Sequence, residues 1–230
     1  IGGRSNGDTL VGPNTANIWN VNAAGTGKVN AITYSGFENL IGGAAADRFV
    51  LGVGAKVAGH IDGGAGNNTL DYSNYPIAVT VNLSMGTATN VSGGVSNFNA
   101  VIGGSGADNL TGSSGRDLLF GGAGADKLTG GSGDDILFDA TPSFGANATT
   151  IDSLLTYWNR TDLDYITRIT QLRAGTTGVV NLPKLNATNV KNDSNIDMLT
   201  GGADNDWFFA SLGSKNKDTV VDLELAEQIN

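Results

Sequence analysis

Apolar side chains recur at every ninth residue along the middle of the chain. They are Leu110, Leu119, Leu128 and Leu137. Each leucine is the centre of a three-residue segment, such as Asn109-Leu110-Thr111, that suits a short strand with the leucine inward and its neighbours outward. The six residues before each segment are too rich in glycine for a helix or a strand and predict a turn. The spacing therefore predicts short strands alternating with turns.

The units that contain these leucines share further positions. They run head to tail from Gly103 to Phe138 and read GGSGADNLT, GSSGRDLLF, GGAGADKLT and GGSGDDILF. Each has glycine at its first and fourth positions and aspartate at its sixth. The aspartates are Asp108, Asp117, Asp126 and Asp135. A disordered, low-complexity tract would not keep leucine at the eighth position of four consecutive units, so the pattern argues against disorder.

One turn and one strand make half a coil, so two units predict a full coil of eighteen residues. Asp108 would then stack on Asp126, and Asp117 on Asp135. Strands of neighbouring coils lie about 4.8 Å apart, and stacked carboxylates would repel at that distance. A hard divalent cation with carbonyl oxygens completing its ligands removes the repulsion, and all-oxygen ligation favours calcium over magnesium. We therefore expect a mainly β chain, a parallel β-roll or β-helix with eighteen-residue coils, that binds several Ca²⁺ ions.

The same phase continues on both sides of the regular block. Asn99 occupies the sixth position of the unit before it and would stack on Asp117, where its amide oxygen could reach the same ion. Asn17 and Asn68 also occupy sixth positions. Because a coil can close without metal through side-chain amide hydrogen bonds, we expect a structural role for these two asparagines.

Five aspartates occupy the sixth position of degenerate units. They are Asp8, Asp47, Asp197, Asp206 and Asp218. Asp197 and Asp206 are predicted ligands, although their stacking partners cannot be read from the spacing. Asp8 and Asp47 have no partner eighteen residues away, and Asp218 follows a three-residue insertion. These three are further candidate ligands.

Residues 140–190 break the β pattern and predict two helices. In the first, Ile151, Leu154, Leu155 and Trp158 share a face after a capping box formed by Thr149 and Asp152. In the second, Leu163, Ile166, Ile169 and Leu172 follow a box formed by Thr161 and Asp164, and Gly175 is the stop signal. We expect the helices to cover an exposed side or end of the β-structure; the alternative is a partner-binding or substrate-binding insertion.

The chain thus divides into three expected domains. Residues 1–139 form a β-roll with degenerate and then regular repeats, residues 140–190 a helical insertion, and residues 191–230 further coils and a cap. The first residues already lie inside what looks like a repeat, so we interpret the chain as part of a longer protein.

The amino-acid composition limits the classes of binding partner that we expect. The 230 residues include 35 glycines and no cysteine, and 22 acidic against 13 basic side chains give a formal net charge of −9. This balance suits a cation binder and argues against nucleic acid or an anionic membrane as main partner. No apolar run is long enough to span a bilayer.

The block from Gly103 to Phe138 resembles the RTX family of bacterial secreted proteins. The resemblance implies a parallel β-roll with calcium between stacked turns, export by type I secretion, and an extracellular or cell-surface location. It also implies that the carbonyl oxygens at the second and fourth positions of each unit join the aspartate. These residues are Gly104, Gly106, Ser113, Gly115, Gly122, Gly124, Gly131 and Gly133. Ser113 departs from the glycine of the family pattern.

Three functions remain open. The first is a calcium-folded structural or adhesive module of a large secreted or cell-surface protein, without catalysis. The second is a self-assembling surface-layer or fibre module that associates through its coil ends. The third is a polysaccharide-active enzyme on a β-helix, against which stand the single histidine, His60, and the lack of a nucleophile motif.

Overall fold

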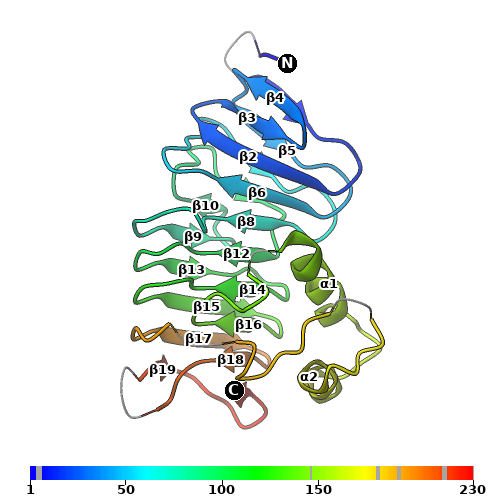
Figure 1. The fold of residues 1–230 in the computed structure, drawn as a ribbon, viewed down its shortest axis with the longest axis vertical. Coiled ribbons are helices and arrows are strands. Elements are labelled where there is room, and N and C mark those ends of the chain that lie inside the picture. The colour runs from blue at the N-terminus through cyan, green and yellow to red at the C-terminus, as the bar shows by residue number, and fades with distance from the viewer. Residues whose placement is uncertain (4–6, 146, 180–181, 191–192, 214–216, 230) are drawn as a thin grey trace.

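The chain winds into a stack of coils, with its first strands at one end and its last at the other (Figure 1). The computed structural model describes residues 1–3, 7–145, 147–179, 182–190, 193–213 and 217–229. Among the strands of these residues most pairs are parallel, and the antiparallel pairs are β2–β3, β3–β4 and β9–β10. The chain is mainly β with a small helical insertion, which confirms the expected parallel β-roll.

Within the described residues the strands form three sheets. The longest runs β20 (Gln228–Ile229), β18 (Trp207–Phe209), β16 (Ile136–Phe138), β14 (Leu118–Phe120), β12 (Ala100–Ile102), β8 (Thr69–Asp71), β6 (Asp47–Leu51), β2 (Asn17–Ala23), β3 (Thr26–Val29) and β4 (Ile32–Ser35). A second runs β10 (Thr87–Ala88), β9 (Thr80–Asn82), β13 (Asn109–Thr111), β15 (Lys127–Ser132), β17 (Met198–Ala203) and β19 (Thr219–Val220). The third runs β1 (Thr9–Val11), β5 (Asn39–Ile41), β7 (Ile61–Asp62) and β11 (Val95–Ser96).

The regular block has the expected eighteen-residue coil. Leu110 of β13 pairs with Leu128 of β15, and Leu119 of β14 pairs with Leu137 of β16. All four leucines are fully buried between the two longer sheets and form the narrow core. Coils outside the block are longer. One coil takes 30 residues from β2 to β6 and 21 residues from β6 to β8. The extra residues between β2 and β6 include the antiparallel strands β3 and β4, and each of these two coils contributes one strand, β5 or β7, to the third sheet.

The insertion contains α1 (Ala148–Trp158) and α2 (Tyr165–Ala174). The predicted cap of α1 at Thr149 is wrong, because the helix begins one residue before it and the side chain of Asn147 accepts the N–H of Thr150. The predicted cap of α2 at Thr161 is also wrong, because the side chain of Asp164 accepts the N–H of Thr167 and caps the helix. Gly175 ends the helix in the left-handed conformation, as predicted. Ile166 was expected on the inner face but is exposed, since α2 buries Arg168 and Tyr165 instead.

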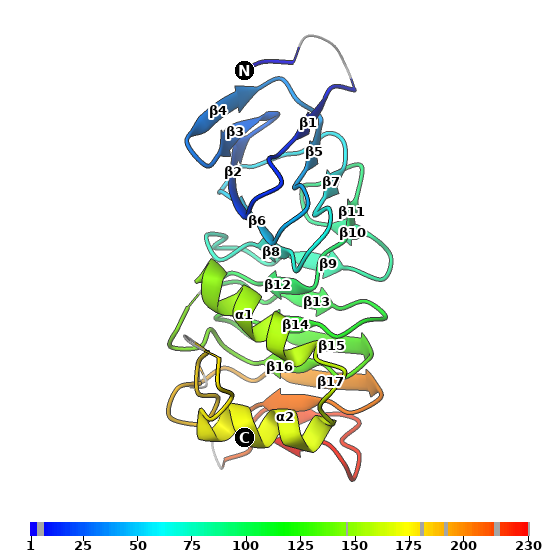
Figure 2. The same cartoon turned by 90° about the vertical axis from the view of Figure 1, so that its right-hand side faces the viewer.

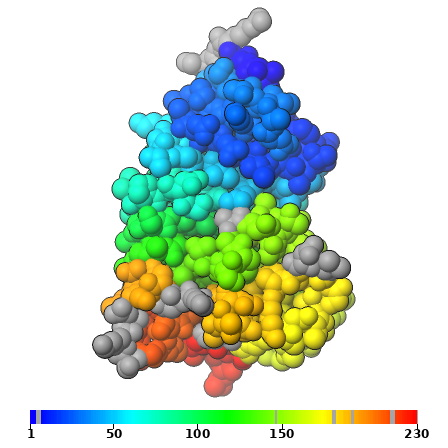
Figure 3. Space-filling model, in the orientation of Figure 1, coloured from blue at the N-terminus to red at the C-terminus, as the bar shows by residue number. Residues whose placement is uncertain are grey.

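The two helices lie against the outer face of the longest sheet (Figure 2). A second hydrophobic cluster joins buried residues of both helices to outward-facing side chains of β12, β14, β16 and β18. Phe120, Phe138 and Phe209 form a stack in this interface, with ring centroids 4.5 Å and 4.9 Å apart. Figure 3 shows the insertion, lime green to yellow, packed along one side of the C-terminal half of the stack. The helices therefore cover a side of the roll, which is the first of the two roles that the sequence predicts for them.

No helix within the described ranges is both long and apolar enough to cross a membrane.

Candidate metal centre

The sixth-position residues of the described turns stack in two columns that run along the roll. The first column, beside the second sheet, consists of Asp108, Asp126, Asp197 and Asp218. The second column, beside the longest sheet, consists of Asn17, Asp47, Asn68, Asn99, Asp117, Asp135 and Asp206. Every aspartate in the two columns is buried. Asp8 lies outside both columns, before β1, and its N–H donates to Glu38.

A ladder of hydrogen bonds joins most neighbouring residues within each column. The backbone N–H of one column residue donates to Oδ1 of the next, at 2.7 Å from Asp108 to Asp126 and 2.8 Å from Asp117 to Asp135. The ladder continues across the insertion to Asp197 and Asp206, each 71 residues beyond its neighbour. The structure thus supplies the stacking partners that the spacing could not give. It also places Asp218 next to Asp197, 21 residues along the chain.

In several of these aspartates the second carboxylate oxygen, Oδ2, has no hydrogen-bond partner within the described ranges. Among the described residues, Oδ2 of Asp126, Asp135 and Asp197 is buried and accepts no hydrogen bond, whereas the carboxyl of Asp206 interacts with that of Glu227. A buried acceptor left without a partner costs about 1–3 kcal/mol, and more when it is charged. Oδ2 of Asp126 and of Asp135 faces the first glycine of its turn, and the carbonyl oxygens of such turns can also act as metal ligands. The donor set is the one that a hard divalent cation prefers.

Burial and mutual repulsion raise the pKa values of the column aspartates. Burial, reinforced by the charge of Asp117, raises the pKa of Asp135 to about 10. Burial and the neighbouring charges of Asp108 and Asp197 raise the pKa of Asp126 to about 8. Burial raises the pKa of Asp197 to about 7. The turns without a cation therefore favour protonated carboxyls and resist the charged form.

Glycine at the first position makes room for the carboxylate. A Cβ at Gly121 would lie 2.5 Å from Oδ2 of Asp126, and one at Gly130 would lie 2.3 Å from Oδ2 of Asp135. At the second position Gly122 and Gly131 have φ angles of 108° and 122°, which a side chain would oppose. In these two turns glycine therefore leaves the space that Oδ2 occupies at the first position and adopts a left-handed φ angle at the second.

The second-position carbonyls predicted as ligands also stack from coil to coil. The N–H of Ala123 donates to Gly104 O at 2.9 Å, and that of Ser132 donates to Ser113 O at 3.3 Å. At the fourth position, Gly124 lies against Gly106 and Gly133 against Gly115. The carbonyl oxygens of Gly104 and Ser113 therefore already accept a hydrogen bond from the next coil.

Ser113 gives its turn a different closure. Its N–H and its hydroxyl both donate to Oδ2 of Asp117, at 2.6 Å and 2.8 Å. The turn of Asp108 is closed in a similar way, by the N–H of Gly104 at 2.6 Å. In these two turns hydrogen bonds already hold one carboxylate oxygen.

The model of the RTX calcium-binding nonapeptide repeat matches the chain in four copies, over residues 60–73, 102–137 and 193–214. The chain carries RTX calcium-binding nonapeptide repeats. These segments contain Asn68 and the column residues from Asp108 to Asp206, while Asn17, Asp47, Asn99 and Asp218 lie outside them. No curated protein is similar enough to count as a relative. The RTX repeats mark the chain as a calcium-binding module.

In two earlier turns, the side-chain amide of a column asparagine donates to the carbonyl oxygens of the turn. Nδ2 of Asn68 donates to Asn97 O at 2.9 Å and lies 3.3–3.5 Å from the carbonyl oxygens of Gly64, Ala65 and Gly66. An NH₂ group surrounded by turn carbonyls satisfies them without metal. Nδ2 of Asn17 likewise donates to Pro13 O at 2.9 Å and to Gly42 O at 3.2 Å. The hydrogen bonds agree with the structural role expected for both asparagines.

Asp47 and Asn99 lie among these amides. Asp47 accepts hydrogen bonds from Asn17 at Oδ1, while its Oδ2 is buried with no hydrogen-bond partner in the described part of the chain. Burial raises the pKa of Asp47 to about 6. Oδ1 of Asn99 accepts the N–H of Asn68 at 3.3 Å, which extends the ladder as far as Asn99. Oδ1 of Asp117, the next residue of the column, is buried and accepts no hydrogen bond from a described residue.

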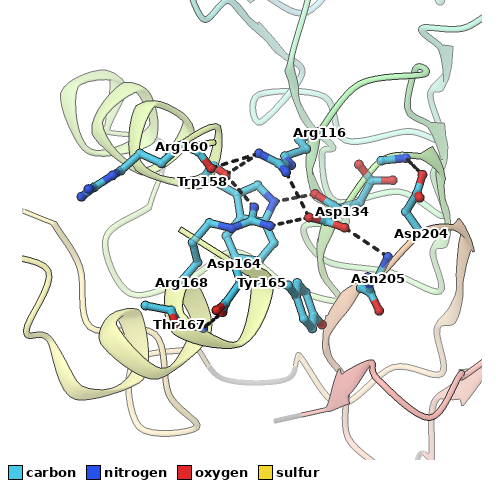
Figure 4. Close-up of polar contacts among 12 residues, drawn as sticks. Arg116, Asp134, Trp158, Arg160, Asp164, Tyr165, Thr167, Arg168, Asp204 and Asn205 are labelled. Carbon is cyan, nitrogen blue, oxygen red and sulfur yellow. Dashed lines mark hydrogen bonds and ion pairs between the residues drawn. The ribbon is translucent and has the colours of Figure 1, made fainter. Parts of the chain in front are cut away.

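The helical insertion contacts the turns of the second column directly (Figure 4). Trp158 Nε1 donates to Asp134 O at 2.6 Å, and the hydroxyl of Tyr165 donates to Asp206 O. The guanidinium of Arg168 is buried, lies 4.4 Å from the ring of Trp158, pairs with the carboxylate of Asp134 and donates to Trp158 O at 2.7 Å. Arg116 adds a second ion pair to Asp134 at 3.3 Å. Each contacted turn residue is a column residue or its immediate neighbour.

Arg168→Ala should release the insertion from the roll. The substitution removes a buried ion pair and the stacking on Trp158, and we expect a loss of about 3 kcal/mol in the free energy of unfolding of calcium-loaded protein. Limited proteolysis within residues 140–190 and near-ultraviolet circular dichroism would detect it. Arg160→Ala is the matched control, because its ion pair with Asp162 is exposed and such pairs contribute about 0–1 kcal/mol. Equal effects of both substitutions would contradict the prediction.

Proposed function

We propose that this chain is a calcium-folded structural or adhesive module of a large secreted or cell-surface bacterial protein. The observation that carries the proposal is the row of buried, partnerless Oδ2 atoms along the two columns. Carboxylates in this setting are stable only when protonated or when bound to a cation. For the coils from Gly103 onward, folding and calcium binding would therefore be one equilibrium, so that the free energy of binding becomes free energy of folding.

The proposed ligands are the column aspartates and the turn carbonyls. The carboxylates are those of Asp108, Asp117, Asp126, Asp135, Asp197, Asp206 and Asp218, with the amide oxygen of Asn99. The carbonyls are those of Gly104, Gly106, Ser113, Gly115, Gly122, Gly124, Gly131 and Gly133. Calcium bound there would neutralise each column and satisfy the Oδ2 atoms. Asp47 stays a weaker candidate than these, since amides flank it on both sides.

The amide-closed turns suggest that the two halves of the roll depend on calcium to different extents. Residues 1–139 hold both kinds of turn, residues 140–190 the helices and residues 191–230 the last coils; we propose this division as the domain structure. Coils before Gly103 are closed by Asn17 and Asn68, and their core contains Trp19 stacked on Phe49 with centroids 5.1 Å apart. These coils should keep their fold in a chelator.

The first experiment combines circular dichroism with sedimentation velocity, in chelator and then in calcium up to about 10 mM, the range of extracellular calcium modules. We expect a cooperative gain of β signal with compaction. Limited proteolysis in chelator should leave a resistant fragment that ends before Gly103. A folded fraction that does not change across the titration would refute calcium-coupled folding.

Self-assembly is the second candidate function. The last coils expose Val221, Leu223 and Leu225, and Leu225 is entirely exposed. An apolar coil end can be covered by another coil, whether of a second copy or of a longer chain. Sedimentation velocity separates the two cases, because self-assembly predicts species larger than the monomer that grow with protein concentration.

Catalysis receives less support from the site. The carboxylates of the columns are engaged in the ladders that hold the coils together. His60 contacts Gly93 O at 2.9 Å through Nδ1 and Ser96 Oγ at 2.8 Å through Nε2, so both ring nitrogens have structural partners. We therefore propose a binding and folding role for the described coils.

A further inference from the structure

One turn of the first column departs from the repeat at its first position. It begins at Asp139, directly after β16, and ends at Asp197, directly before β17, with the insertion between them. The preceding turns of this column begin with Gly103 and Gly121, and the first position of each faces the carboxylate at the sixth. Asp139 stands where those glycines stand and is itself buried. The turn therefore has two aspartates where the regular turn has one.

The two aspartates meet a third from the next coil. One carboxylate oxygen from each of Asp139, Asp197 and Asp218 lies within 4.8 Å of the others. All three side chains are buried, with relative exposures of 1–2%. Oδ1 of Asp197 accepts the N–H of Asp126 at 2.6 Å, while Oδ2 of Asp197 is buried and accepts no hydrogen bond from any described residue. Asp197 thus links this turn to the next coil, and its Oδ2 atom is the one without a hydrogen-bond partner in the described residues.

We propose that Asp139, Asp197 and Asp218 bind one divalent cation, calcium by its oxygen ligands, and that this ion joins the two ends of the helical insertion. The inference rests on the proposed calcium binding but concerns Asp139, which lies outside the sixth-position pattern. Three carboxylates at this separation repel strongly in a buried site, and a hard cation with oxygen ligands removes the repulsion.

The third carboxylate distinguishes this site from its neighbours in the column. Elsewhere in the first column an ion between two coils meets two aspartates, such as Asp108 and Asp126. Affinity for calcium in oxygen sites rises with the number of charged ligands. The site of Asp139 should therefore fill at lower calcium concentration than a site with two carboxylates.

The position of the site gives the ion a structural role. Asp139 precedes the insertion and Asp197 follows it, so an ion bound to both closes the loop of residues 140–196. Closing a long loop at its base reduces the conformational freedom of the segment. Occupancy should therefore favour docking of α1 and α2 on the longest sheet.

The test is calcium titration of the full chain by isothermal calorimetry, with limited proteolysis of residues 140–196 as the second readout. Asp139→Asn keeps the size of the side chain and removes its charge; Asp139→Gly restores the glycine of the regular turns. We expect both variants to lose one high-affinity ion, or to bind it about tenfold more weakly, and to be cleaved in the insertion at calcium levels that protect the parent chain. Asp162→Asn, at an exposed ion pair, is the control and should bind as the parent does.

The outcomes separate the two proposals. A parent chain that binds no calcium overturns the proposed function and this site with it. A parent chain that binds calcium, with both Asp139 variants matching its ion count, affinities and protease resistance, overturns the site alone. Because the glycine variant has the backbone preference of the regular turns, a folding defect confined to the asparagine variant leaves the test in place.

Discussion

Asp135→Asn is expected to stabilise the chain in chelator and to weaken its binding of calcium. Asp135 is fully buried, and its Oδ2 has no hydrogen-bond partner among the described residues. Without calcium the folded chain must keep this carboxyl protonated, which costs about 1.4 kcal/mol for each pH unit above the unfolded pKa, and the neutral amide removes that cost. The carbonyl oxygen of Gly201 lies near the first position of this turn, as that of Asn97 does in the turn of Asn68, and can accept from the new amide.

In calcium the same substitution removes a charged ligand from the second column. Asp135 lies between Asp117 and Asp206, so ions on either side of it would lose a carboxylate. We expect the calcium concentration at the folding midpoint to rise about tenfold or more, since a tenfold change corresponds to about 1.4 kcal/mol. Urea unfolding in chelator and in calcium, with Asp162→Asn as the surface control, measures both effects. Effects of the same sign under the two conditions would contradict a cation at this turn.

Acidification should stabilise the calcium-free chain, which is the reverse of ordinary acid denaturation. The pKa of Asp197 is raised by burial to about 7, and those of Asp126 and Asp135 are raised to about 8 and about 10. A carboxyl with a raised pKa in the folded state contributes stability that is fully present below its unfolded pKa of about 4. That contribution is lost as the pH rises toward the folded pKa, by about 1.4 kcal/mol per pH unit for each group.

The pH dependence should change sign when calcium is added. Saturating calcium requires ionised ligands, so acidification then releases ions and destabilises the fold. Thermal unfolding at several pH values between 5 and 8, once in excess chelator and once in about 10 mM calcium, tests both signs. A calcium-free chain that is more stable at pH 8 than at pH 5 would show that the columns do not hold buried, protonated carboxyls.

Local spacing was sufficient for the regular part of the roll. The eighteen-residue distance between Asp108 and Asp126 follows from the length of a turn plus a strand, and the register of β13 on β15 confirms it. The partners of Asp197 and Asp206 lie 71 residues away because a whole folded insertion intervenes. Nothing in a nine-residue pattern encodes the length of an insertion, so these pairs needed the structure.

Docking of the helices had a signal in the sequence that the repeat pattern obscured. Strands of the second sheet have polar residues beside the central leucine, as in Asn109–Thr111. The alternate strands have apolar residues there, as in Leu118–Phe120 and Ile136–Phe138, and these are the strands that α1 and α2 cover. The charged fifth positions, Arg116 and Asp134, follow the same alternation and mark the contact surface.

No sequence pattern marks Asp139 as a candidate ligand. It follows the last regular unit and lies 58 positions before Asp197, so it reads as the first residue of a loop. Only the return of the chain to the same edge of the stack brings its carboxylate to Asp197 and Asp218.

Near-identical coils create an ambiguity that the docked helices resolve. If the coil of residues 103–120 took the place of that of residues 121–138, its leucines would still point inward and its aspartates would still stack, so the repeats alone permit slipped pairings. Trp158 and Tyr165 bind carbonyl oxygens on opposite sides of the junction, at Asp134 before the insertion and at Asp206 after it. Both contacts form together only when β18 pairs with β16. The aperiodic segment thus selects one register among several and protects the periodic coils from misfolding by slippage.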